Sequence, residues 1–77
     1  MKITVELIAT LSEYSPTGDA RFEYELPDGA NVLALIDALG IPDERAGAVM
    51  LNGVTASHHD GLEDGASVTL IPPMAGG

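Results

Sequence analysis

The carboxy-terminal residues are those whose types and spacing could do chemistry. The sequence ends in Gly76-Gly77, preceded by Pro72-Pro73-Met74-Ala75. Because glycine has no side chain, such an end can enter a narrow channel and present its terminal carboxylate to another protein. A carboxylate becomes electrophilic once one of its oxygens is part of a good leaving group. The tail is therefore interpreted as a reagent that a partner activates, and the alternative is an ordinary frayed terminus.

Two other groupings resemble sites. Adjacent residues of an extended chain point to opposite sides, and His58-His59-Asp60 has neither a third histidine nor a cysteine to help it bind a metal. A solvated loop fits this cluster better, and no metal is expected. Glu23 and Glu25 resemble a carboxylate pair, but the alternation over residues 22–26 makes them the exposed side of a strand. Without a serine–base arrangement or a phosphate-binding glycine loop, the chain is not expected to be catalytic alone.

A folded domain must position the tail, and the apolar pattern predicts its first elements. The partial alternation over Met1 to Leu11 predicts a strand that begins at the first residue. Turn residues over 15–19 separate it from a second strand over 22–26, antiparallel to the first. Asn31 is a predicted helix N-cap and Gly40 a predicted helix stop. Between them lies one apolar stripe that must cover a sheet: Val32, Leu35, Ile36 and Leu39.

The second half predicts three more strands. Residues 41–45 fit either a loop or a short turn of helix. Asn52-Gly53 is a hairpin signal between the apolar run 48–51 and a return strand that starts at Val54. Leu62 is expected to anchor the polar loop that follows, and residues 67–71 form the last strand. Pro72-Pro73 cannot continue a ladder of hydrogen bonds, so they are expected to stiffen the exit of the chain as an extended arm.

Composition restricts the partners. The 77 residues form one domain without cysteine, and 12 acidic residues stand against Lys2, Arg21 and Arg45, a net charge of −9. Such a charge disfavours nucleic acid and anionic membranes; it either steers a basic protein partner or only maintains solubility. Because the sequence has neither a signal-peptide pattern nor a run of about 18 apolar residues, a cytoplasmic location is expected.

Three blocks carry a resemblance to a known family. The segments Val49 to Val54, Leu62 to Val68 and Ile71 to Gly77 resemble the "VNG", "L-x-D-G-D-x-V" and "PP-x-x-GG" signatures of the MoaD/ThiS family of sulfur carriers. Two departures are Met50-Leu51, where many members have valine before Asn-Gly, and Ala66 in place of an acidic residue. Pro72-Pro73 looks more like the small subunit of molybdopterin synthase than the thiamine-pathway carrier.

The resemblance implies a fold and a chemistry. The fold is α+β, a ubiquitin-like β-grasp with a mixed sheet of four to five strands and one main helix across one face, over residues 1–71, with 72–77 as a flexible tail. The carboxylate of Gly77 is expected to be the reacting group. It would be adenylated by a ubiquitin-activating-enzyme-like partner that uses ATP, and then converted to a thiocarboxylate. No cofactor is expected on this chain itself.

The resemblance also implies partners. The sulfur would pass to a pterin precursor in the large molybdopterin synthase subunit. The tail residues Pro72, Pro73, Met74, Ala75 and Gly76 and the open sheet face are expected to bind partners, with apolar contacts over that face and Pro72–Met74. Thiamine and cysteine pathways remain alternative destinations for the sulfur. A ubiquitin-like modifier, joined to lysines through Gly77, and a pure binding module are further alternatives.

Overall fold

A computed structural model describes residues 1–73 of the chain, so Met74 to Gly77 lie outside the described residues. The strands and helices follow one another as β1 (Lys2–Leu7), the 3-10 helix η1 (Ala9–Tyr14), β2 (Arg21–Glu25), α1 (Val32–Leu39), the 3-10 helix η2 (Asp43–Arg45), β3 (Val49–Leu51), β4 (Val54–Ala56) and β5 (Ser67–Leu70). The predicted order of five strands and one main helix is confirmed.

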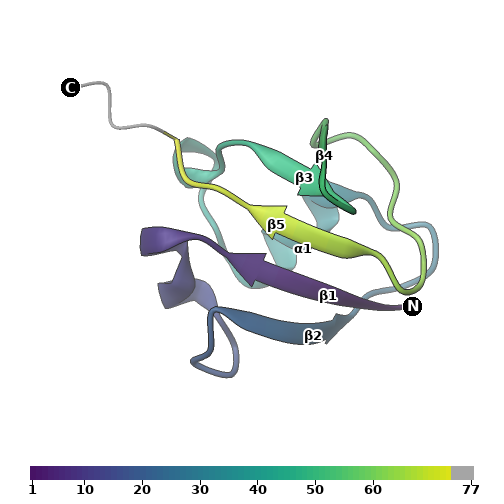
Figure 1. Cartoon of the computed structure of the whole chain (residues 1–77), viewed down its shortest axis with the longest axis horizontal. Helices are drawn as coiled ribbons and strands as arrows, with labels where there is room; N and C mark the ends of the chain where they lie inside the picture. Colours follow the sequence, from purple (N-terminus) through teal and green to yellow (C-terminus); the bar gives the residue numbers. More distant parts are fainter. Residues whose placement is uncertain (74–77) are drawn as a thin grey trace.

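The strands form one mixed sheet in the order β2-β1-β5-β3-β4, which Figure 1 shows face-on. The central pair is parallel, with Thr4 opposite Ser67 and Leu7 opposite Leu70. All other neighbouring pairs are antiparallel. The α+β class and the mixed sheet with a single main helix are as predicted.

The two faces of the sheet differ in polarity. One face carries the buried side chains Ile3, Val5, Phe22, Val68 and Leu70, with exposed fractions of 7% or less. Alternation places Glu23 and Glu25 on the opposite face, where both are exposed. Their interpretation as the solvated side of an ordinary strand is confirmed.

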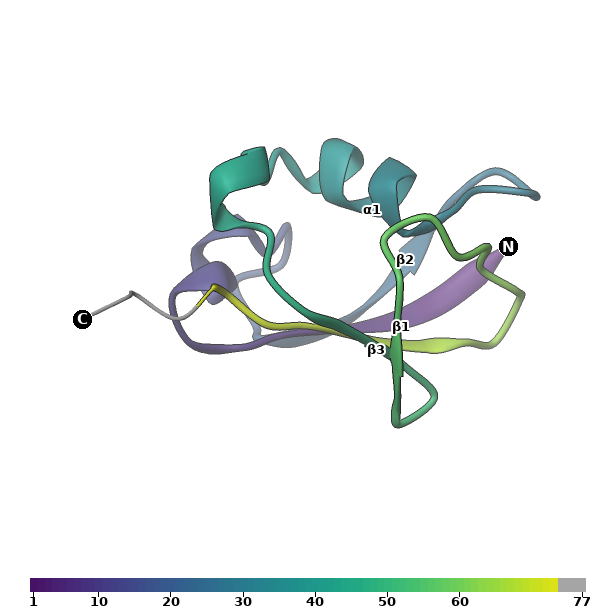
Figure 2. The same cartoon turned by 90° about the horizontal axis from the view of Figure 1, so that it is seen from above.

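Helix α1 covers the apolar face, as Figure 2 shows in a view along the sheet. The helix begins as predicted, because the Asn31 side chain accepts a hydrogen bond from the Ala34 amide at 3.0 Å. It ends at Gly40, whose φ of 76° closes the last turn. Val32, Leu35 and Ile36 are buried in the core, and Leu39 is partly buried and packs against it.

The first strand is shorter than predicted. β1 ends at Leu7, and Ala9, with a φ of 52°, turns the chain into η1 instead of continuing toward Leu11. The turn allows Leu11 to become 1% exposed, a burial that the partial alternation of the sequence does not reveal. Of the two alternatives left open for residues 41–45, the structure has the helical turn, η2.

The Asn52-Gly53 hairpin is confirmed. Both residues have positive φ, 51° and 82°, as a two-residue hairpin loop of type I′ requires. Asn52 also ties the hairpin to the start of β5, because its side chain accepts from the Ser67 amide at 2.9 Å and its amide donates to the Ser67 carbonyl at 2.8 Å. Leu62, 6% exposed, anchors the following loop as predicted.

No helix within residues 1–73 is long and apolar enough to cross a membrane.

The burial of the helix stripe can be measured with a pair of leucines. Leu35 is 0% exposed, whereas Leu39 is only partly buried. We expect Leu35→Ala to lower the free energy of unfolding by about 2–5 kcal/mol, and Leu39→Ala to lower it by less, because less apolar surface is lost. Urea denaturation measures both, and an equal loss in the two variants would contradict the helix orientation.

Candidate functional site

The described part of the predicted site is the place where the chain leaves the sheet. Strand β5 ends at Leu70, and Ile71, Pro72 and Pro73 are the last residues that the structure describes. The remaining predicted site residues, Met74, Ala75, Gly76 and Gly77, lie outside the described residues. In Figure 1 the exit lies beside the segment that leads into β3. The geometry of the site is therefore the geometry of this exit.

Backbone hydrogen bonds hold the end of β5 on both sides. The Leu70 carbonyl accepts from the Ile8 amide at 3.0 Å, and the Ile71 amide donates to the Ala48 carbonyl at 2.9 Å. Pro72 and Pro73 have no amide hydrogen and cannot extend this ladder. The last backbone donor before the tail is thus the Ile71 amide.

Gly47 lies directly against the exit. A Cβ at position 47 would stand 2.6 Å from the Pro73 nitrogen and 2.7 Å from the Pro72 carbonyl carbon, and it would also collide with the Ile71 carbonyl oxygen. These partners are backbone atoms, which cannot rotate away as a flexible side chain can. Gly47 does not have positive φ, so the close approach of the two chain segments is what requires glycine.

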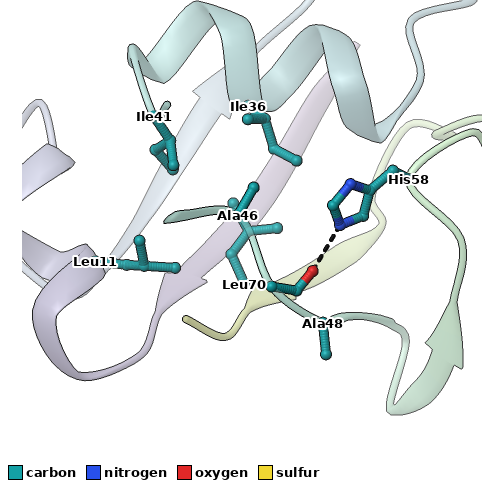
Figure 3. Close-up of a pocket in the computed structure, with 8 residues that line it drawn as sticks. Leu11, Ile36, Ile41, Ala46, Ala48, His58 and Leu70 are labelled. Carbon is teal, nitrogen blue, oxygen red and sulfur yellow. Dashed lines mark hydrogen bonds between the residues drawn. The ribbon is translucent and has the colours of Figure 1, made fainter. Parts of the chain in front are cut away.

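His58 is held differently from the solvated loop predicted for it. It is half-buried, and its Nε2 lies 2.6 Å from the Gly47 carbonyl oxygen, as the dashed line in Figure 3 shows. Because a carbonyl only accepts, Nε2 must be the protonated nitrogen of the ring. The neighbouring His59 is exposed, and its backbone amide donates to the Ser57 hydroxyl at 3.1 Å. The prediction of a solvated loop is correct for His59 and wrong for His58.

The position of His58 follows from the start of helix α1. The Val32 amide donates to the Asp60 carbonyl at 3.1 Å, and the Leu33 amide donates to the His58 carbonyl at 3.0 Å. Helix-start amides have no partner within the helix, so the loop satisfies them. Its backbone therefore caps the helix, while the ring of His58 reaches Gly47.

A small apolar pocket lies beside the exit (Figure 3). It has no room for a water molecule. The side chains that line it, together with Gly47, come from separate segments of the chain: Leu11, Ile36, Ile41, Ala46, Ala48, His58 and Leu70. The pocket is thus part of the packing that supports the exit.

Within residues 1–73 no group of three His, Cys, Asp or Glu side chains could hold a metal ion.

Arg45, the last residue of η2, lies at the start of the loop that contains Gly47 and contacts η1. Its guanidinium donates to the Tyr14 hydroxyl at 3.2 Å, lies 3.3 Å from a Glu13 carboxylate oxygen, and stacks 5.5 Å from the centre of the Tyr14 ring. An exposed ion pair contributes little by itself. The three contacts together link η2 to η1, so the loop over residues 46–48 has a fixed starting point.

The open face of the sheet is more polar than the expected apolar docking surface. Strand register places these side chains on it: Lys2, Thr4, Glu6, Arg21, Glu23, Glu25, Met50, Thr55, Ser67 and Thr69. Among these strand residues Met50 alone is apolar, and it is half-buried. Charged and hydroxyl groups thus dominate this face.

Sequence reasoning missed Gly47 and assigned His58 wrongly, while its prediction for residues 74–77 lies outside the described residues. The only local signal at Gly47 is the run of small residues Ala46-Gly47-Ala48. The need for glycine arises from contact with residues 71–73, which pattern reasoning does not place beside this run. For His58 the sequence offers no signal that distinguishes it from His59.

The close approach at Gly47 gives a stability test with a matched control. We expect Gly47→Ala to lower the free energy of unfolding by about 1–3 kcal/mol, because the new methyl overpacks against backbone. Gly61→Ala is the control, since a Cβ there meets nothing within 4 Å and Gly61 has no positive φ. Thermal or urea unfolding compares the two, and equal stabilities would contradict the close packing of the exit.

The family model described as ThiS family matches residues 5–77, nearly the whole chain. No curated protein matches the sequence.

Solved structures agree in fold. A putative molybdopterin converting factor, subunit 1, from Pyrococcus furiosus is 27% identical with a TM-score of 0.77, covering 96% of this chain and 99% of that one. SAMP1 from Haloferax volcanii is 23% identical with a TM-score of 0.75, covering all of both chains. A complex of subunits 1 and 2 of the molybdopterin-converting factor from Helicobacter pylori matches at 21% identity and a TM-score of 0.58, also covering 100% of both chains. With the mixed sheet and single helix described above, these likenesses show a ubiquitin-like β-grasp fold, and the chain belongs to the ThiS family, whose relatives are sulfur carriers or ubiquitin-like modifiers.

Proposed function

We propose that this protein is a sulfur carrier whose terminal Gly77 is adenylated, converted to a thiocarboxylate and used as a sulfur donor in molybdopterin biosynthesis. The observation that carries the proposal is the family match, which extends through Gly77 and includes the Gly-Gly end. The supported exit at Ile71 to Pro73 adds a structural reason, because it gives the tail a defined point of departure.

The chemistry requires two steps at one carbon atom. A carboxylate oxygen of Gly77 attacks the α-phosphate of ATP, pyrophosphate leaves, and an acyl-adenylate forms. A nucleophile at the oxidation level of sulfide then attacks the carbonyl carbon, AMP leaves with the C–O bond electrons, and a thiocarboxylate remains. The activating partner binds ATP and supplies catalysis, and this chain contributes the reacting terminus without a cofactor of its own.

The molybdopterin destination rests on two observations. The sequence has Pro72-Pro73 before the tail, and the similar Pyrococcus furiosus structure is a putative molybdopterin converting factor subunit. The Helicobacter pylori match is a complex of subunits 1 and 2 of such a factor. We therefore propose a large synthase subunit as the acceptor partner and a ubiquitin-activating-enzyme-like adenylyltransferase as the activating partner, with residues 72–77 as the tail that both partners receive.

A second candidate function is a ubiquitin-like modifier. It is favoured by two likenesses: to SAMP1 from Haloferax volcanii, which covers all of both chains, and to a structure of small archaeal modifier protein 1, which covers 95% of this chain. A modifier would use the same acyl-adenylate, but an amine would then attack the carbonyl carbon in place of sulfur. The two functions share the activation step and differ in the product.

Mass spectrometry of the protein isolated from its own host distinguishes the products. We expect a species heavier by about 16 Da, because sulfur replaces one oxygen at the terminus. A ladder of conjugates would instead support the modifier. The acceptor pathway is identified by deleting, one at a time, the genes for the sulfur-accepting steps of thiamine, cysteine and molybdopterin biosynthesis and measuring the thiocarboxylate form in each strain. If the thiocarboxylate accumulates only when a thiamine or cysteine step is lost, the molybdopterin destination is wrong.

Two tail variants test the role of the glycines. Deleting Gly77, or changing Gly76→Phe, should abolish adenylation, because the first removes the reacting residue and the second adds a bulky side chain beside it. The thermal midpoint should stay near that of the wild type, since terminal residues contribute little to a fold. ATP–pyrophosphate exchange with the adenylyltransferase of the same organism measures the first effect and calorimetry the second. Normal exchange by both variants would contradict a reacting tail.

The charge of −9 predicts a salt-dependent encounter with the partner. We expect the association rate with the adenylyltransferase to fall as ionic strength rises, because exposed charges are screened beyond about 10 Å at 0.1 M salt. Stopped-flow measurement would show it. If the open face docks, the salt dependence of the association rate should weaken more in the double variant Glu23→Gln/Glu25→Gln, on that face, than in Asp43→Asn/Glu44→Gln, in η2. A rate that is independent of salt would leave the charge as a solubility feature.

A further inference from the structure

We infer that Gly47, Ala48 and His58, which together we term the exit clamp, are positioning residues that set the direction in which the reactive tail leaves the domain. The inference rests on the proposed function, since a direction matters only if the terminus must reach an active site. None of the three carries chemistry itself. Their role would be to aim residues 71–73.

Three contacts build the exit clamp. The Ala48 carbonyl accepts from the Ile71 amide at 2.9 Å. The backbone of Gly47 packs so closely against residues 71–73 that a single methyl group would overlap it. His58 Nε2 donates to the Gly47 carbonyl at 2.6 Å. Because Gly47 packs against residues 71–73 and its carbonyl is held by His58, loss of the ring removes a restraint on the loop and allows it to shift.

The exit clamp is attached to rigid parts of the fold. The backbone of His58 caps α1 through the Leu33 amide, and Arg45, just before the loop, is bound to Tyr14 of η1. The side chains beneath the loop are packed without room for water. The exit clamp therefore connects residues 71–73 to the helix as well as to the sheet.

The short tail makes this direction consequential. Residues 74–77 are four residues, and four extended residues span at most about 14 Å. Such a short segment has little slack to correct a wrong starting direction. When the domain is docked on the adenylyltransferase, a displaced exit would thus reduce the fraction of complexes whose carboxylate lies at the α-phosphate of ATP. This lowers kcat and leaves KM, which reports docking of the domain, nearly unchanged.

Adjacent histidines provide a matched experiment. ATP–pyrophosphate exchange with the adenylyltransferase of the same organism is measured for the wild type, His58→Ala, His58→Gln and His59→Ala, with the protein concentration varied to separate kcat from KM. Hydrogen exchange of the Ile71 amide, followed by NMR in the free protein, reports the exit clamp directly. Thermal midpoints establish that each variant is folded at the assay temperature.

The expected pattern is specific to positioning. His58→Ala should lower kcat by about tenfold to a hundredfold, since a misplacement of about 1 Å can have such an effect, and it should speed exchange of the Ile71 amide. His58→Gln should recover much of both, because its amide can still donate to the Gly47 carbonyl. His59→Ala should match the wild type. Gly47→Ala, with Gly61→Ala as its control, should reproduce the loss of kcat by disturbing the exit, and it serves as the test if His58→Ala unfolds.

Three results would overturn the inference, each in a recognisable way. Unchanged Ile71 exchange in both His58→Ala and Gly47→Ala means that the exit clamp does not hold the exit. Faster exchange with kcat within twofold of the wild type means that the exit direction is not used. A change confined to KM means that these residues belong to a docking surface. If the wild-type protein is not adenylated, the proposed function is wrong, and the inference fails with it whatever the variants do.

Discussion

The parallel pairing of β1 with β5 is the constraint on which the rest of the structure depends. Parallel neighbours cannot be joined by a tight hairpin, so the chain between Leu7 and Ser67 must cross over, and helix α1 lies within that crossover. The pairing also brings the carboxyl ends of both strands to the same edge of the sheet. η1, which follows β1, and the tail, which follows β5, therefore begin side by side. The loop at Gly47 and the ring of His58 gather at that edge, so one backbone pairing determines where residues 71–73 leave the sheet.

Local sequence signals predicted those elements whose causes are local. Asn31 caps the start of the helix, Gly40 ends it, and Asn52-Gly53 forms the hairpin between β3 and β4, because capping and turn chemistry act within a few residues. Prediction failed where distant segments meet. Leu11 is buried by a turn at Ala9, and Gly47 is constrained by residues more than twenty positions later. His58 and His59 are identical in type and adjacent, so only the three-dimensional arrangement separates a held ring from a solvated one. The assignment of Gly77 as the reacting residue stays a prediction from tail composition and family resemblance, because Met74 to Gly77 lie outside the described residues.

The described residues separate an apolar interior from a charged exterior. Within residues 1–73 there is no metal-binding cluster of three ligands, and the pocket beside the exit does not admit water. The core is formed by apolar side chains, without a buried polar or charged residue among those described. Such an interior stabilises a fold and leaves recognition to the surface, where 12 acidic residues are distributed over a small domain.

The central position of β5 has a consequence for biosynthesis. The last strand to be synthesised fills the middle of the sheet, between β1 and β3, and most partners of these strands are far apart in sequence. A nascent or broken chain that ends before Ser67 leaves β1 and β3 with no common neighbour, and the core side chains Val68 and Leu70 are missing. Such a fragment cannot complete the domain and is exposed to proteases. The domain therefore forms only after β5 has been synthesised, so folded molecules are those that already contain the strand leading to Pro72-Pro73.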